Sequence, residues 1–263
     1  MTSKMPSAAI LVLDMLAATS HRRRSAQELC RAGAIMGFSD ATIRVALTRL
    51  AQQEKIEKHD RASYSLNTQG NRLQLEIENW RERVAWIVPW RGDWIVVHDG
   101  TTDRSDKTSL RRHRRALLLR GLQKWKQGLY LRPNNLAGGA ASLRVQLSEL
   151  GLAKGAELFV AGDFCQQQTA EILGLWNIPV LRRNYEKLLA RAKDGQRRLL
   201  ELRPEAAARE SLLVGRELIS HVMRDPLLPS EILKGPQLRE LAQAIADYQN
   251  ASKRIWDDLL NDQ

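Results

Sequence analysis

Five residues between Thr42 and Gln52 have side chains that can contact nucleic-acid bases. Arginine pairs with the O6 and N7 acceptors of guanine in the major groove, and valine contacts the methyl group of thymine. The segment contains no acidic residue that would repel phosphates. We expect base contacts from its small, hydroxylated and guanidinium side chains, namely Thr42, Arg44, Val45, Thr48 and Arg49.

A helix has to present these side chains on one face. The apolar residues of the segment recur at i, i+3, i+4 and i+7, which is the spacing of a stripe that faces a core. Ser39 or Asp40 can cap the helix, which we expect to run to about Gln53. The stripe consists of Ile43, Ala46, Leu47 and Leu50.

Two more helices are predicted before this one. A mostly apolar stretch follows a capping serine at residues 7–18. Ser25 and Glu28 have the spacing of a capping box, which opens a second helix that ends near residues 33–37. Two helices, a short glycine-bearing turn and a third helix follow the order of a helix-turn-helix.

A wing follows the third helix in this interpretation. The alternation in "KIEKHDRASYSL" predicts two short strands, at residues 55–58 and 63–66. Its tip can approach phosphates through Lys58, His59 and Arg61, and the preceding basic loop can do so through Arg22, Arg23 and Arg24. The alternative is a small helical domain whose hairpin is simply exposed to solvent and does not contact nucleic acid.

The overall composition agrees with a polyanionic partner. The chain has 263 residues, a formal net charge of +11 and a pI near 10.0, and such a surface attracts nucleic acids and acidic metabolites alike. It contains no apolar run of the ~20 residues that a membrane span needs and no secretory signal, so we expect a cytoplasmic protein. Cys30 and Cys165 lack ligand spacing, so we expect two buried thiols and no catalytic residue, metal or cofactor.

The middle of the chain predicts the order β-α-β-β-α-β, which is a ferredoxin-like sandwich. Its first helix carries a basic run on the polar side, Arg111, Arg112, Arg114 and Arg115, and Leu110, Leu117, Leu118 and Leu119 on the apolar side. The run is either a solvated face or a binding site for an anion.

The fold class expected from these patterns is α+β. We predict a winged helix-turn-helix at 1–67, a linker helix at 68–90, the ferredoxin-like domain at 91–165 and an all-helical domain at 166–263. Leu73, Ile77, Trp80 and Val84 form an apolar seam on the linker helix, which fits packing on the next domain and dimerisation equally.

Three further stretches carry a resemblance to a known family. "MRDPLLPSEIL" at residues 223–233 resembles the L-R-D-P-x-L-P-x-E-L-L signature of the PaaX family, repressors of phenylacetic acid catabolism. "WRGDWIVV" and "GLYLRP" are similar to two other motifs of that family, and "TIRVALTRL" to its recognition helix. The chain departs from the family's usual sequence just before Arg224 and after Leu233.

The resemblance implies a winged-helix repressor with a Cas2-like middle domain, released from double-stranded DNA by an aryl-acetyl coenzyme A thioester. For an acyl-CoA effector, the candidate phosphate ligands are Arg111, Arg112 and Arg115. A homodimer is expected, because one recognition helix reads too few base pairs to find a site in a genome.

The sequence also contains features of two other functional classes. A Cas2-like metal-dependent nuclease would place Asp99 at the end of the first strand of the middle domain, but it needs several oxygen ligands, and Asp103 and Asp106 lie in a loop. An RNA-binding adaptor is disfavoured, because no aromatic-rich strand supplies stacking surfaces.

Overall fold

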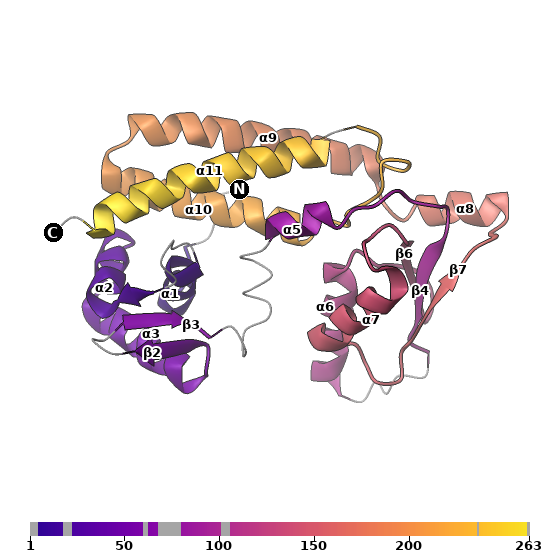
Figure 1. Ribbon diagram of the computed structural model, residues 1–263, viewed down its shortest axis with the longest axis horizontal. Helices are drawn as coiled ribbons and strands as arrows, with labels where there is room; N and C mark the ends of the chain where they lie inside the picture. Colours follow the sequence, from indigo (N-terminus) through magenta and orange to yellow (C-terminus); the bar gives the residue numbers. More distant parts are fainter. Residues whose placement is uncertain are drawn as a thin grey trace. The chain divides into compact units, whose positions relative to one another are not determined.

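The computed structural model describes residues 5–17, 23–59, 63–67, 80–100, 106–235 and 237–261 (Figure 1). The fold is α+β, with two small antiparallel sheets and a helical C-terminal region, as the sequence predicts. The chain forms two compact units: unit 1 comprises residues 1–80, 188–220 and 241–263, and unit 2 comprises 81–187 and 221–240. The region predicted as a C-terminal domain therefore contributes to both units.

Unit 1 begins with the predicted helix-turn-helix. Its helices are α1 (Ala8–Ala17), α2 (Ala26–Ile35) and α3 (Asp40–Gln52), and its strands are β1 (Arg24–Ser25), β2 (Ile56–His59) and β3 (Ser63–Leu66). The strands form an antiparallel sheet in the order β1-β3-β2. Strand β1 was not predicted. Its residues Arg24 and Ser25 pair with Tyr64 and Ser63 of β3.

The predicted caps form at both helix starts. The Ser25 side chain accepts a hydrogen bond from the Glu28 amide at 3.1 Å, and the Glu28 carboxylate accepts one from the Ser25 amide at 2.7 Å. Ser39 caps α3 by accepting from the Thr42 amide. These bonds satisfy amide groups that have no partner within the helix, so they fix where α2 and α3 begin.

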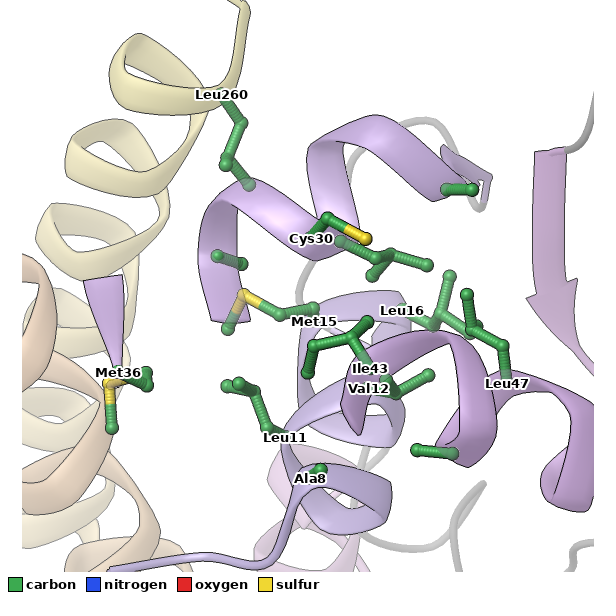
Figure 2. Close-up of a cluster of buried hydrophobic side chains, with 14 of the residues drawn as sticks. Ala8, Leu11, Val12, Met15, Leu16, Cys30, Met36, Ile43, Leu47 and Leu260 are labelled. Carbon is green, nitrogen blue, oxygen red and sulfur yellow. The ribbon is translucent and has the colours of Figure 1, made fainter. Parts of the chain in front are cut away.

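The core of unit 1 draws on both ends of the chain. Figure 2 shows Met15, Cys30 and Ile43 of the three N-terminal helices in one apolar cluster, and α11 (Gln237–Asn261) contributes Leu260. Helices α2 and α3 pack closely at Gly33, where a Cβ atom would lie 2.4 Å from Cγ1 of Ile43. Cys30 is buried as predicted, whereas the prediction was wrong for Cys165, which is exposed.

The end of the predicted linker helix packs within unit 1. Residues 68–79, and with them Leu73 and Ile77 of the seam, lie outside the described residues. Trp80 begins α5 (Trp80–Ala85), is buried, and donates from Nε1 to the Gln249 side chain of α11 at 2.8 Å. At this position the seam serves intramolecular packing. The other helices that contribute to unit 1 are α9 (Ile178–Glu201) and α10 (Pro204–Met223).

Unit 2 contains the predicted β-α-β-β-α-β order. Its elements are β4 (Trp94–His98), α6 (Lys107–Leu119), β5 (Gln123–Lys126), β6 (Leu129–Pro133), α7 (Gly139–Leu150) and β7 (Glu157–Ala161). The sheet has the order β5-β6-β4-β7 with antiparallel neighbours, which is the ferredoxin-like arrangement. Helices α6 and α7 cover one face and bury Ile95 and Val97 of β4 (Figure 1). The other face carries Trp94, which stacks on Trp176 after α8 (Gln166–Leu173).

No helix among the described residues is long and apolar enough to span a membrane.

Candidate nucleic-acid interface

Helix α3 exposes all five residues that the sequence predicts to contact bases. Its stripe of Ile43, Ala46, Leu47 and Leu50 is buried in the core of unit 1. Thr42, Arg44, Val45, Thr48 and Arg49 are exposed on the opposite side. Val45 is 59% exposed although it is apolar, so the fold gives this side chain no packing role and leaves it available for a partner.

The hydroxyl groups of this face are held by the helix itself. Thr42 Oγ1 lies 2.9 Å from Ser39 Oγ, and Thr48 Oγ1 donates to the Arg44 carbonyl at 3.1 Å. Among the described residues, neither Arg44 nor Arg49 forms an ion pair. The two guanidinium groups can therefore approach an external acceptor without breaking a salt bridge.

Both strands of the wing form. Strand β3 has the predicted bounds, and β2 begins and ends one residue later than predicted. Strands β2 and β3 pair in register, with Lys58 opposite Tyr64 and His59 opposite Ser63. Lys58 is exposed, while His59 is half-buried and its Nε2 lies 2.7 Å from Ser65 Oγ. Arg61 lies outside the described residues. Of the three predicted wing residues, Lys58 is therefore the one whose positive charge is seen to be exposed in the described part of the chain.

The three arginines of the basic loop have different surroundings. Arg22 lies outside the described residues, and Arg23 is exposed. Arg24 is only 5% exposed, and its guanidinium forms ion pairs with Glu28 at 2.8 Å and with Asp257 of α11. We therefore correct the expectation for Arg24: its charge is neutralised inside unit 1, so it is a structural residue and not a phosphate ligand.

The local charges agree with this role of Arg24. Burial opposes the ionisation of Glu28, yet the hydrogen bonds from Arg24 and from the Ser25 amide lower the pKa of Glu28 below its ordinary value. The carboxylate is therefore charged near neutral pH. It links the capping box of α2 to the ion pair with α11.

The candidate effector arginines lie on the exposed side of α6. Arg111, Arg112 and Arg115 are all exposed, and Arg111 donates from Nε to the Lys107 carbonyl at 3.4 Å. The predicted apolar side was partly wrong: Leu118 is 51% exposed, and the buried positions of α6 are His113, Ala116 and Leu117. The structure therefore keeps the basic run together on a surface without placing it in a buried cavity.

Asp99, the residue of the alternative nuclease hypothesis, is buried beside a histidine. His113 Nδ1 accepts a hydrogen bond from the Ala153 amide at 3.2 Å, which leaves the proton on Nε2 facing Asp99 Oδ2 at 3.2 Å. Asp106 caps α6, and Asp103 lies outside the described residues. Within the described ranges no group of three acidic, histidine or cysteine side chains could hold a metal.

Sequence reasoning missed a buried polar network around the "RDPLLP" segment in unit 2. Arg132 of β6 is 1% exposed and donates to Asn135 Oδ1 at 2.9 Å and to the Arg120 carbonyl at 2.5 Å. Asn135 in turn donates to the Leu227 carbonyl at 2.9 Å, and Arg83 donates to the Met223 carbonyl at 2.8 Å. These bonds fasten the segment to α5 and to the ferredoxin-like domain.

Asp225 is the buried carboxylate of this network. Its Oδ2 accepts from the Tyr185 hydroxyl at 2.6 Å and its Oδ1 from the Leu227 amide at 2.8 Å. Burial raises the pKa of Asp225 despite these bonds and the nearby arginines. The sequence suggested a pair between Arg224 and Asp225, and the structure identifies Tyr185 and the Leu227 amide as partners of the carboxylate.

Leu227 shows why the segment needs these contacts. Its φ of 51° lies in the left-handed region, which side chains other than glycine rarely adopt. The bond from its amide to Asp225 and the bond from Asn135 to its carbonyl hold this conformation. Only the proline pair and the acidic residue were visible in the sequence as signs of a bend.

The chain was compared with known proteins by sequence and by structure. No family model matches the chain. The chain is 26% identical over 215 residues to the transcriptional repressor PaaX of Escherichia coli strain K12, and the match covers 75% of this chain and 64% of that repressor. The chain thus matches less than two thirds of the repressor's length.

One similar solved structure is that of an uncharacterized protein from Mycobacterium tuberculosis. It superposes with a TM-score of 0.66 at 20% identity, covering 97% of this chain and 99% of that one. At this identity the likeness concerns the fold. The match to PaaX is a distant sequence similarity to a transcriptional repressor.

Proposed function

We propose that this protein is a transcriptional regulator that binds double-stranded DNA through α3, as a repressor of a catabolic operon. The observation that carries the proposal is the outer face of α3, where two arginines, two threonines and a valine are exposed together. A helix with this face can enter a major groove and contact base edges. The distant homology to a transcriptional repressor supports the same function.

Each residue has a distinct role in this proposal. Arg44 and Arg49 contact guanines, while Thr42, Val45 and Thr48 contact the remaining base edges and thymine methyl groups. Arg23 and Lys58 bind phosphates, together with Arg22, His59 and Arg61 of the basic loop and the wing. Phosphate contacts determine the position and orientation of the protein on DNA, and the α3 contacts determine which base sequence is recognised.

The regulator acts as a homodimer in this proposal. One α3 helix contacts only a few base pairs, and two helices about one helical turn of DNA apart read enough sequence to select an operator.

An acyl-CoA or related anionic metabolite releases the DNA. Arg111, Arg112 and Arg115 are exposed on one helix, and a planar guanidinium pairs with phosphate through two hydrogen bonds while staying charged. Calorimetry against aryl- and alkyl-CoA thioesters, with a triple alanine variant of these residues as comparison, tests this role. Binding that survives the triple change would exclude these arginines, and no binding by any thioester would exclude this effector class.

A mobility-shift assay with duplex DNA from the protein's own promoter region, with and without magnesium, tests the central proposal. We expect a salt-sensitive complex and intact DNA in both conditions, because charge neutralisation dominates the affinity. Double alanine replacement of Arg44 and Arg49 should abolish preference for the footprinted site. Cleavage that requires magnesium would favour the Cas2-like nuclease, and the absence of any complex would refute the regulator.

A further inference from the structure

Strand β7 forms an edge of the sheet in unit 2. The order β5-β6-β4-β7 gives β7 one strand neighbour, β4, and no strand among the described residues lies on its other side (Figure 1). Phe159 is 45% exposed and Val160 is 47% exposed, and because neighbouring residues of a strand point to opposite faces, both faces of this edge are apolar. An exposed apolar edge strand is a template for pairing with another strand.

The register of β7 with β4 determines which N–H and C=O groups of β7 face away from the sheet. In an antiparallel pair, alternate residues exchange hydrogen bonds with the neighbouring strand, and the residues between them turn their N–H and C=O groups away. The Asp99 amide, just after β4, donates to the Gly128 carbonyl on the β6 side at 2.8 Å, so Val97, two residues earlier, also turns its backbone groups toward β6. Leu158 is the partner of Val97 and therefore turns its own backbone groups away from β4, where its carbonyl accepts a hydrogen bond from the Arg144 side chain at 2.8 Å. By the period of two, Val160 also turns its backbone groups outward, and Phe159 turns them toward β4.

We propose that β7 pairs with β7 of a second copy of this chain, antiparallel, with Phe159 on the two-fold axis. Leu158 then faces Val160 of the second copy and exchanges both backbone hydrogen bonds with it. Phe159 faces Phe159 at a position without hydrogen bonds, where Cα atoms come within about 4.5 Å and side chains are closest. Aromatic pairs at such positions contribute to sheet pairing beyond their buried area.

The strand's own sequence selects this register. All five residues of β7 are paired when the axis passes through Phe159. An axis through Leu158 would place Phe159 opposite the Glu157 carboxylate, and an axis through Val160 would place Glu157 opposite Asp163. Arg144 does not prevent the pairing, because a carbonyl oxygen has two lone pairs and can accept a second hydrogen bond.

A second copy fits this edge better than a different partner does. The edge is complementary to itself, since apolar residues meet apolar residues and Glu157 faces Ala161 rather than a like charge. The proposed recognition of an operator by DNA binding also requires two copies of α3, and only this requirement rests on the proposed function. A symmetric pair of β7 strands would supply the second copy without using α3 or the wing.

Disulfide trapping tests the register without DNA. In a Cys165→Ser background, which removes the exposed native thiol, we expect Phe159→Cys to form a covalent dimer under mild oxidation, because Cα atoms about 4.5 Å apart are within disulfide range. Glu157→Cys is the matched control: two such residues would lie at opposite ends of the pair, about 13 Å apart along the strand, and should stay monomeric on a denaturing gel. Cross-linking of Glu157→Cys that equals or exceeds that of Phe159→Cys would overturn the register.

Sedimentation velocity tests the interface in solution. We expect a dimer for the unmodified protein and a monomer for Phe159→Lys, which places two ammonium groups across the axis, with the same circular dichroism for both. A monomeric unmodified protein, or a Phe159→Lys variant that remains dimeric, would overturn the proposal. Affinity for a single half-site, measured separately, should be the same for both proteins, so failure of DNA binding is distinguished from failure of this interface.

Discussion

Replacing Tyr185 with phenylalanine should destabilise unit 2 through the loss of a single hydroxyl group. That hydroxyl donates to Asp225 Oδ2 at 2.6 Å, and both residues are buried. Phenylalanine keeps the ring, so no large cavity forms, but a buried carboxylate oxygen loses its partner. A hydrogen bond to a charged group contributes about 1.5 to 3 kcal/mol, which corresponds to a fall of about 3 to 12 °C in the midpoint of thermal unfolding for a chain of this size.

Tyr248→Phe is a matched control for this prediction. Tyr248 is also buried, but its hydroxyl donates to the neutral Glu210 carbonyl at 3.3 Å, so its loss should cost about 1 kcal/mol or less. Differential scanning calorimetry of both variants gives the comparison. Hydrogen exchange in residues 223–233 should accelerate in Tyr185→Phe alone. Equal destabilisation by the two variants would refute the claim that Asp225 depends on Tyr185.

The remaining predictions concern unit 1. Arg44→Ala or Arg49→Ala should cost about 1 to 3 kcal/mol in affinity for the cognate site with little change on random DNA, measured by titration, and equal losses on both would make them phosphate ligands. Arg23→Ala should reduce the salt dependence of DNA binding by about one unit of slope, whereas Arg24→Ala should instead lower the unfolding midpoint. Because the pKa of Glu28 is lowered, its stabilisation is present above pH 4.5 and is lost as the pH falls through the folded pKa; Glu28→Gln should not show this acid loss in urea unfolding.

Local patterns predicted most of the fold because they depend on neighbours in the sequence. The stripe on α3 and the cap at Ser25 are determined within a few residues, and both were predicted correctly. The β-α-β-β-α-β order followed from alternating periodicities in the same way. The α+β fold class was therefore accessible from sequence alone.

Contacts between distant segments could not be predicted in this way. Nothing around Arg24 indicates Asp257, and three adjacent arginines look alike in sequence although the structure buries one and exposes another. The pairing of Tyr185 with Asp225 depends on how α9 meets the bend after α10, which local periodicity does not encode. The same limit explains Leu118, whose apolar character suggested burial that the helix does not give it.

The ion pair between Arg24 and Asp257 has a consequence for how the protein is made. Its partners are 233 residues apart, and Leu260 of the same helix completes the core around Met15 and Cys30 (Figure 2). A ribosome therefore releases α1, α2 and α3 long before the residues that seal their core exist. The nascent segment has an incomplete apolar cluster until then, so the native packing of α1, α2 and α3 should be reached only when translation has passed α11.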